Sequence, residues 1–121
     1  IIFLLLLNLI LPSRKYQGYE TVEYRLEGKK HHLLVADTRE KWEKGLMNFR
    51  KLEGVQGMIF IFPDKQLRHF WNKNTYLDLD VYWLDDDKIV GKDFLPSIVK
   101  SKQLVIINSK AKVNKVIEIV R

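Results

Sequence analysis

Short runs of residues with the two-residue period of a β-strand recur along this chain of 121 residues, and they constrain its fold more than any other feature. Residues 57–63, GMIFIFP, are apolar at nearly every position and stop at a proline, which is typical of a central strand. In residues 77–83, leucine, valine and tryptophan alternate with more polar side chains, so one face of that strand is apolar. Residues 104–107 and 116–120 predict two further strands.

Two opposed strands and a turn are expected earlier in the chain. Val22, Tyr24 and Leu26 alternate with charged residues, and the turn is expected at Gly28 and the two lysines that follow it. The return strand, residues 32–36, is apolar enough to be buried on both faces. Residues 21–36 therefore predict a β-hairpin.

A short helix is expected after this hairpin. Asp37 can cap its first amides, and Glu40, three residues later, can complete a capping box. Gly45 weakens the helix and keeps it short. With six to eight strands and this helix, the sequence predicts an α+β fold that is mostly antiparallel β. The expected architecture is a compact single β-rich domain, barrel-like or a sandwich, with one or two short helices.

The first eleven residues, IIFLLLLNLIL, are almost uniformly apolar, but at about 1.5 Å per residue they are too few to span a bilayer core of about 30 Å. We interpret residues 1–13 as the remnant of a signal peptide or of an N-terminal membrane anchor, with a buried first strand as the alternative. Residues 14–19 are then a linker, and residues 20–121 the single domain. The sequence thus predicts an extracytoplasmic protein, secreted or anchored to the membrane by this segment.

Composition and motifs exclude several kinds of chemistry. The chain contains no cysteine, which excludes disulfides, thiolate zinc sites and cysteine nucleophiles. It contains no glycine-rich phosphate loop and no nucleophile elbow. His31 and His32 are neighbours on an expected strand and point to opposite faces, so they cannot easily chelate one ion. We therefore predict no metal site and no cofactor, and the oligomeric state is left open.

The net charge of +6 comes entirely from the C-terminal third of the chain. Residues 1–87 contain 13 basic and 13 acidic residues, whereas residues 88–121 contain eight basic and two acidic residues. A basic end can face an anionic membrane or a nucleic acid. Because these lysines are scattered and no nucleic-acid motif is present, we interpret them as a solvated surface and do not predict nucleic-acid binding.

The segment FWNKNTYLDLDVYWLDDD, residues 70–87, carries the candidate site. Asn74 and Thr75 have side chains that favour turns, which explains them without a ligand. Trp71 beside Lys73 is a costly combination in a turn, whereas an indole and an ammonium together suit a polar or anionic ligand, or a sugar face. This segment therefore predicts a site as well as a turn.

We predict that this site is a pocket for a small polar or anionic ligand or for a partner. The predicted binding residues are Arg50, Trp71, Lys73, Asn74, Thr75 and Asp80. In this hypothesis the two cations supply positive charge, Asp80 orients one of them, and Trp71 forms an apolar wall. Two alternatives stay open. One is a hydrolase or lyase that uses Asp80 and Lys73 as acid and base. The other is a purely structural network of buried hydrogen bonds among the polar residues of this set.

Three motifs in the same order carry a resemblance to a known family: VADTREKWEKGLMNFR, then GMIFIFP, then FWNKNTYLDLDVYWLDDDKIV. The chain resembles the domain of unknown function 192 family, closely over residues 33–94 and loosely over residues 95–119. The resemblance implies a compact, mostly-β domain that is often exported, and it supplies no established activity. The matching positions are Gly45, Leu46, Met47, Arg50, Gly57, Met58, Phe62, Trp71, Lys73, Asn74, Thr75 and Asp80. Asn72 and Asp78 depart from the family, which has methionine and proline there.

Overall fold

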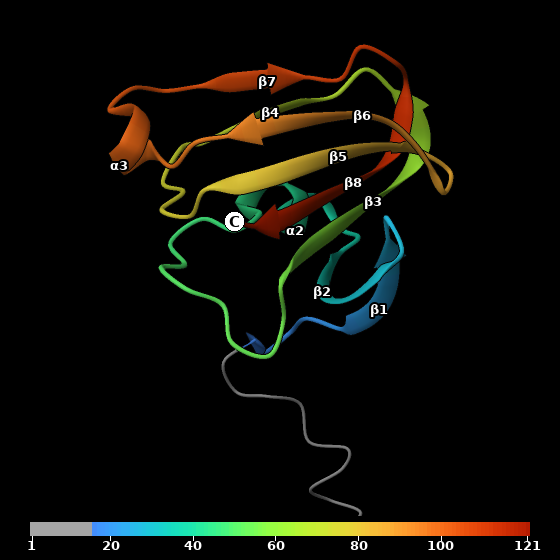
Figure 1. Ribbon diagram of the computed structural model, residues 1–121, viewed down its shortest axis with the longest axis horizontal. Helices are drawn as coiled ribbons and strands as arrows, with labels where there is room; N and C mark the ends of the chain where they lie inside the picture. The colour runs from blue at the N-terminus through green and yellow to red at the C-terminus, as the bar shows by residue number, and fades with distance from the viewer. Residues whose placement is uncertain (1–15) are drawn as a thin grey trace, which may run out of the picture.

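The structure, a computed structural model, describes residues 16–121 and contains two short helices and eight strands within them (Figure 1). The strands are β1 (Thr21–Leu26), β2 (Lys29–Ala36), β3 (Gly57–Gln66), β4 (His69–Trp71), β5 (Leu79–Asp85), β6 (Lys88–Leu95), β7 (Ile106–Asn108) and β8 (Val113–Val120). The helices are α2 (Arg39–Lys44) and α3 (Ile98–Ser101). The predicted apolar leader, residues 1–13, and the first two residues of the predicted linker lie outside the described residues.

Six strands form one sheet in the order β1-β2-β3-β8-β5-β6, and β4 pairs with β7 in a second, two-stranded sheet. All pairs are antiparallel except β2 and β3, which run parallel and are connected by the segment that contains α2. Parallel neighbours require such a crossover, because a tight turn can join only antiparallel strands. The last strand, β8, lies in the middle of the sheet, between β3 and β5.

The large sheet curls until its two ends touch through side chains. The hydroxyl of Tyr24, on β1, donates to the Asp87 carboxylate at 2.8 Å, and the hydroxyl of Tyr82 donates to Glu27 at 2.9 Å. The first and last strands, β1 and β6, are not hydrogen-bonded to each other, so the sheet is not closed into a barrel. The smaller apolar core lies on the face of the sheet that carries Tyr82. It consists of Leu26, Leu33, Val35, Ile59, Tyr82, Leu84 and Ile117.

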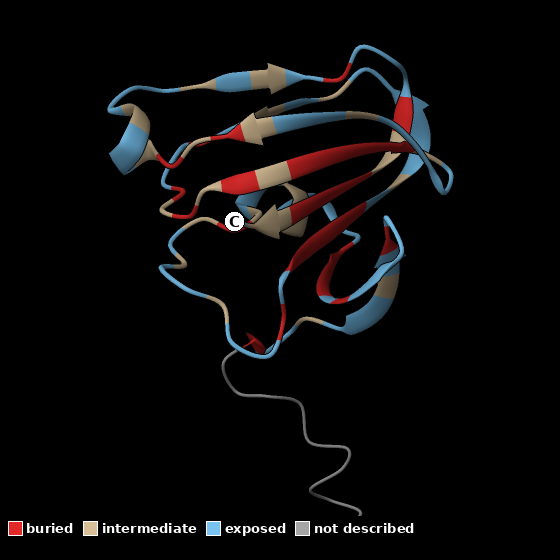
Figure 2. Cartoon of the chain, in the orientation of Figure 1, coloured by how far each residue is buried: buried red, intermediate tan, exposed pale blue. Residues whose placement is uncertain are grey.

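The larger apolar core lies on the other face of the sheet. It is covered by α2, by the loop that follows α2, and by the β4–β7 pair, while the central strands are its most buried part (Figures 1 and 2). Phe70, on β4, stacks edge-on against Phe60 of β3 and Trp83 of β5, with ring centroids 4.8 and 5.6 Å away. These aromatic contacts fix the small sheet over the large one.

The predicted α+β fold, mostly antiparallel and with short helices, is confirmed. Three local predictions were wrong. The α2 N-cap is Thr38, whose hydroxyl accepts from the Lys41 amide, and not Asp37. Pro63 does not end β3, because the β3–β8 pairing is irregular there and needs no amide from proline. The strand expected from residue 77 begins at residue 79.

The described part of the predicted linker packs against the domain. Tyr16 is buried in the larger core, and its hydroxyl donates to the main-chain oxygen of Glu53 and accepts from the Glu53 amide. Tyr19 is half-buried against the same core. No helix within residues 16–121 is long and apolar enough to cross a membrane.

Gly57 permits the close approach of β3 and β8. A Cβ at this position would overlap with the main-chain oxygen of Glu118, so Gly57→Ala must push the strands apart. We expect it to lower the free energy of unfolding by about 3 kcal/mol. Urea denaturation of the wild type and the variant measures this loss, and the m-value is expected to be the same in both.

Gly54→Ala is the control for this substitution. A Cβ on Gly54 meets nothing within 4 Å, and only its positive φ of 77° disfavours alanine, by about 1 kcal/mol. Equal losses in the two variants would contradict the role of strand approach at Gly57.

Candidate functional site

The predicted site segment follows β4 as an ordered turn. Trp71, the last residue of β4, is 45% exposed, and the Lys73 ammonium lies 5.3 Å from the centre of its ring. Asn74 has a φ of 49°, and its main-chain oxygen accepts from the Asn48 amide at 2.9 Å. Thr75 is buried, and its hydroxyl donates to the main-chain oxygen of Lys73 at 3.0 Å. The turn therefore orders these side chains through local contacts.

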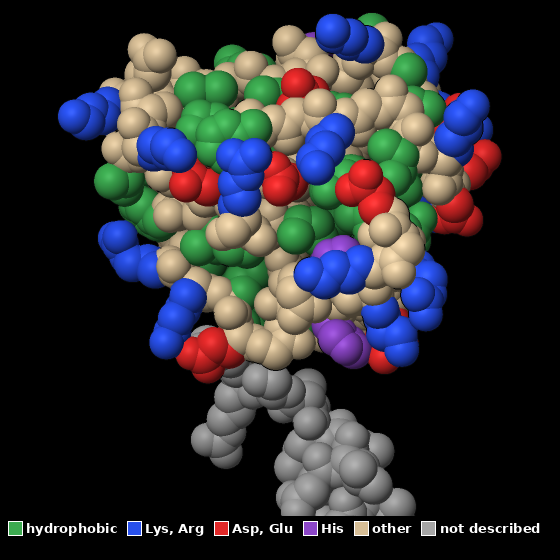
Figure 3. Space-filling view, in the orientation of Figure 1, with side chains coloured by type: hydrophobic (Ala, Val, Ile, Leu, Met, Phe, Trp, Pro, Cys, Tyr) green, Lys and Arg blue, Asp and Glu red, His purple; other side chains and the backbone are tan. Residues whose placement is uncertain are grey.

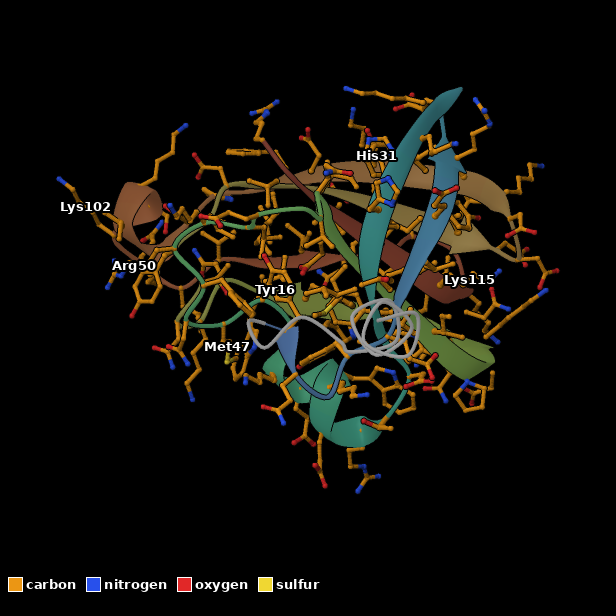
Figure 4. The ribbon with its side chains drawn as sticks, turned by 90° about the horizontal axis from the view of Figure 1, so that it is seen from below. Tyr16, His31, Met47, Arg50, Lys102 and Lys115 are labelled. Carbon is orange, nitrogen blue, oxygen red and sulfur yellow. The ribbon has the colours of Figure 1, made fainter. Side chains whose placement is uncertain are left out.

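The structure places Arg50 beside the end of this turn and Asp80 on β5, where it pairs with Arg121. The Arg50 guanidinium stacks 4.2 Å from the ring centre of Tyr76, at the edge of the molecule that also carries Lys102 (Figure 4). Asp80 lies on the same face of β5 as Tyr82, and its carboxylate is 3.5 Å from Nε of Arg121. The expected convergence of Trp71, Lys73 and Asp80 on one hollow is not what the structure has.

The acid–base alternative depends on contact between Asp80 and Lys73. Among the described residues, the Asp80 carboxylate pairs with Arg121, and the Lys73 ammonium lies over Trp71. The two side chains form no hydrogen bond or ion pair with each other within residues 16–121. The geometry that this alternative requires is therefore not present.

A structural hydrogen-bond network does exist in this segment, but its centre is Asn72, which no hypothesis included. The Asn72 side chain is fully buried. Its amide nitrogen donates to the Pro96 oxygen at 3.0 Å and to the Ser101 hydroxyl at 2.9 Å, and its oxygen accepts from the Val105 amide at 2.8 Å. Asn72 thus connects β4 to α3 and to the segment that enters β7.

The basic C-terminal third is spread over the surface and partly neutralised. On the face drawn in Figure 3, lysine and arginine side chains are dispersed with acidic side chains among them. Lys115 forms an ion pair with Asp87 at 2.9 Å, and Lys100 lies 3.8 Å from Asp78. These cations pair with carboxylates from the preceding part of the chain.

A cavity of about 370 Å³ lies over the larger core, between the end of α2 and strands β3, β4 and β8. Aromatic and aliphatic side chains form most of its wall. The lining residues are Trp42, Glu43, Lys44, Gly45, Leu46, Met47, Phe60, Phe62, Leu67, Arg68, His69, Phe70, Trp71, Thr75 and Glu118. Of the six predicted binding residues, Trp71 and Thr75 line this cavity, whereas Arg50, Lys73, Asn74 and Asp80 do not.

Glu118 is the unusual polar group of this cavity. It lies on β8 opposite Met58 of β3 and Val81 of β5, whose side chains share its face of the sheet. Only 4% of the residue is exposed, and burial raises the pKa of its carboxyl to about 8. Within residues 16–121 the carboxyl has no hydrogen bond or ion pair. A buried carboxyl without a partner is costly, and such groups concentrate at functional sites.

The other charged groups of the cavity wall are already paired or lie at its exposed side. The Arg68 guanidinium donates to the Asp64 carboxylate at 3.1 Å and to the Val113 oxygen at 3.1 Å, and it stacks on Phe62. The ring of His69 bonds to Asn108. Two side chains of opposite charge at the end of α2, Glu43 and Lys44, are exposed.

Sequence reasoning missed Glu118, although the sequence contains a signal for it. Val116, Glu118 and Val120 alternate along the last strand, so an acid occupies a position of its apolar face. That pattern is visible only if the strand is known to be central, because an edge strand can turn the same residue to water. The structure supplies this missing fact.

The sequence profile of the DUF192 family, described as "Uncharacterized ACR", matches residues 22–121. The chain belongs to the DUF192 family. The resemblance predicted from the three motifs is thereby confirmed. No curated protein sequence matches this DUF192 chain.

Two solved structures are similar to this DUF192 domain. One, from Sinorhizobium meliloti 1021 and described as a proposed transcription regulator, is 29% identical, with a TM-score of 0.65. The match covers 84% of this chain and 79% of that one. The other, a protein of unknown function from Novosphingobium aromaticivorans DSM 12444, is 21% identical, with a TM-score of 0.72 over 90% and 79% of the two chains. The second likeness concerns the fold alone.

The buried carboxyl predicts an unusual dependence of stability on pH. In the unfolded chain Glu118 ionises near its ordinary pKa of 4.5, whereas in the folded domain its pKa is about 8. Between these values the folded state keeps a proton that the unfolded state has lost, so stability falls as the pH rises from about 5 to about 8. The total fall is about 5 kcal/mol at most. Urea denaturation across this range measures it.

Glu118→Gln should remove this fall, because glutamine stays neutral and has nearly the same shape. Asp80→Asn is the matched control: it removes a carboxylate from the opposite face of the sheet, and the fall should persist. If Glu118→Gln keeps the wild-type slope, the assignment of the titration to the buried carboxyl is wrong.

Proposed function

We propose that this DUF192 domain binds a small molecule in the cavity between α2, β3, β4 and β8. The observation that carries the proposal is the Glu118 carboxyl, which has no hydrogen-bond or ion-pair partner within residues 16–121 and lies at an otherwise largely apolar cavity wall. Ligand sites are typically concave and apolar, with a few polar groups that orient the ligand. The cavity volume of about 370 Å³ is within the range of such sites.

The cavity supports a small-ligand role through a different set of residues from those in the sequence hypothesis. Trp71 and Thr75 are shared, while Glu118 and the rings of α2, β3 and β4 are new. An anionic ligand has less support than the sequence indicated, because Arg68 already bonds to Asp64 and neither Arg50 nor Lys73 lines the cavity. A ligand with an apolar body and a group that bonds to Glu118 fits this wall better.

Blocking the cavity tests the proposal. Met47 lines it and is half-buried, so the indole of Met47→Trp should occupy the space of a ligand. We expect this variant to fold and to lose binding of small aromatic probes, neutral and charged, detected by ligand-observed NMR. Val90→Trp, on exposed β6 and away from the cavity, should bind like the wild type. If no probe binds the wild type, or if both variants bind equally well, the cavity is not the binding site.

We also propose that the domain works outside the cytoplasm, which the apolar segment 1–11 supports. In cells whose cytoplasmic membrane is intact but whose outer layers have been removed, added protease should then degrade the complete protein, while a cytoplasmic marker protein survives. Protection of both proteins until the membrane is lysed would contradict this location.

A further inference from the structure

We infer that the ligand of this cavity is an organic amine, whose ammonium contacts the Glu118 carboxylate while its apolar body lies among the aromatic rings. This inference rests on the proposed function, since it names the ligand class of the same site. Three features carry it: the lack of a partner for the Glu118 carboxyl among the described residues, the aromatic wall, and the distribution of the other charges.

The described residues supply no hydrogen-bond partner for the carboxyl, which lies at the cavity wall. Glu118 lies between Met58 and Val81 on the sheet face, and no described donor bonds to it. A buried carboxylate is tolerated when an opposite charge with hydrogen-bond donors contacts it. A protonated amine supplies both, because an ammonium group carries one positive charge and up to three donors.

The cavity wall favours a cation over a neutral or anionic group. Trp42, Phe60, Phe62, Phe70 and Trp71 line it. The faces of such rings carry negative potential and attract ammonium groups, most strongly where water is excluded. Two of these rings already stack with cations of the protein itself, Arg68 on Phe62 and Lys73 on Trp71.

The charges facing Glu118 from each surrounding element do not oppose an incoming cation. On the sheet, β3 and β5 contribute the apolar Met58, Phe60 and Val81. Around the cavity, Arg68 is neutralised by Asp64, and the His69 ring bonds to Asn108. At the end of α2, the exposed Glu43 and Lys44 have opposite charges. The buried carboxyl of Glu118 therefore determines which ligand charge the cavity prefers.

Binding of an amine must release a proton. The carboxyl keeps its proton below a pKa of about 8, whereas an aliphatic ammonium keeps its own to about pH 10. When the ammonium displaces that proton, the products are an ammonium–carboxylate pair and one proton taken up by the buffer. Affinity for the amine then rises about tenfold per pH unit between about pH 6 and about pH 8, and levels off above. A neutral ligand shows neither effect.

Isothermal titration calorimetry of the wild-type domain with phenethylamine, phenethyl alcohol and phenylpropionate tests this. The three probes share a ring and differ in charge. At pH 7 the amine should bind most tightly and release close to one proton, measured as the difference in heat between phosphate and HEPES buffers. The alcohol should release none, and phenylpropionate should bind weakest.

Two variants assign the effect to the carboxyl. Glu118→Gln should lose proton release and the pH dependence of amine binding while keeping alcohol binding, whereas Asp80→Asn should behave like the wild type. Proton release that persists in Glu118→Gln would come from another group and would overturn the inference.

The outcomes also separate this inference from the proposal beneath it. If the alcohol or phenylpropionate binds in the cavity more tightly than the amine, the amine inference is wrong while the small-molecule site stands. If none of the three probes binds and Met47→Trp changes nothing, the proposed function fails as well.

Discussion

The position of β8 in the middle of the sheet is the constraint on which the rest of the structure depends. Its pairing with β3 joins Gly57 to Ile119, and its pairing with β5 joins Leu79 to Val120. Without β8, the first three strands and the β5–β6 hairpin would be two separate units with exposed edges. The same strand completes the two apolar cores and carries the one acid that faces the cavity from the sheet.

Glu118 is the feature of the cavity that supports the proposed binding site. A glutamate at this position costs stability at neutral pH, and a leucine or glutamine would avoid that cost. A lysine or a serine at a neighbouring position would be a partner for the carboxyl, but the cross-strand neighbours of Glu118, Met58 and Val81, are apolar. Buried acids that cost stability in this way are common where their unsatisfied hydrogen-bonding capacity is used to bind a ligand or to transfer a proton.

Local patterns predicted most of the strands and the helix α2, but not β4 or α3, because side-chain alternation and glycine or proline positions depend on near neighbours alone. The same patterns could not order the strands, since the position of β8 depends on contacts about sixty residues apart in the chain, such as Gly57 with Ile119. The predicted site failed at Asp80 for a related reason. Asp80 alternates with Val81, and only the fold shows that the face of Val81, not that of Asp80, looks toward the cavity. Glu118 could be recognised only after that face was known.

The late appearance of β8 in the sequence has a consequence for biosynthesis. Translation proceeds from the N-terminus, so the chain carries one unpaired edge on β3 and one on β5 until β8 has been made. Pairing partners so distant along the chain also slow the search for the native topology. The domain should consequently acquire its native shape in a single late step, with the acid-bearing wall of the cavity arriving last.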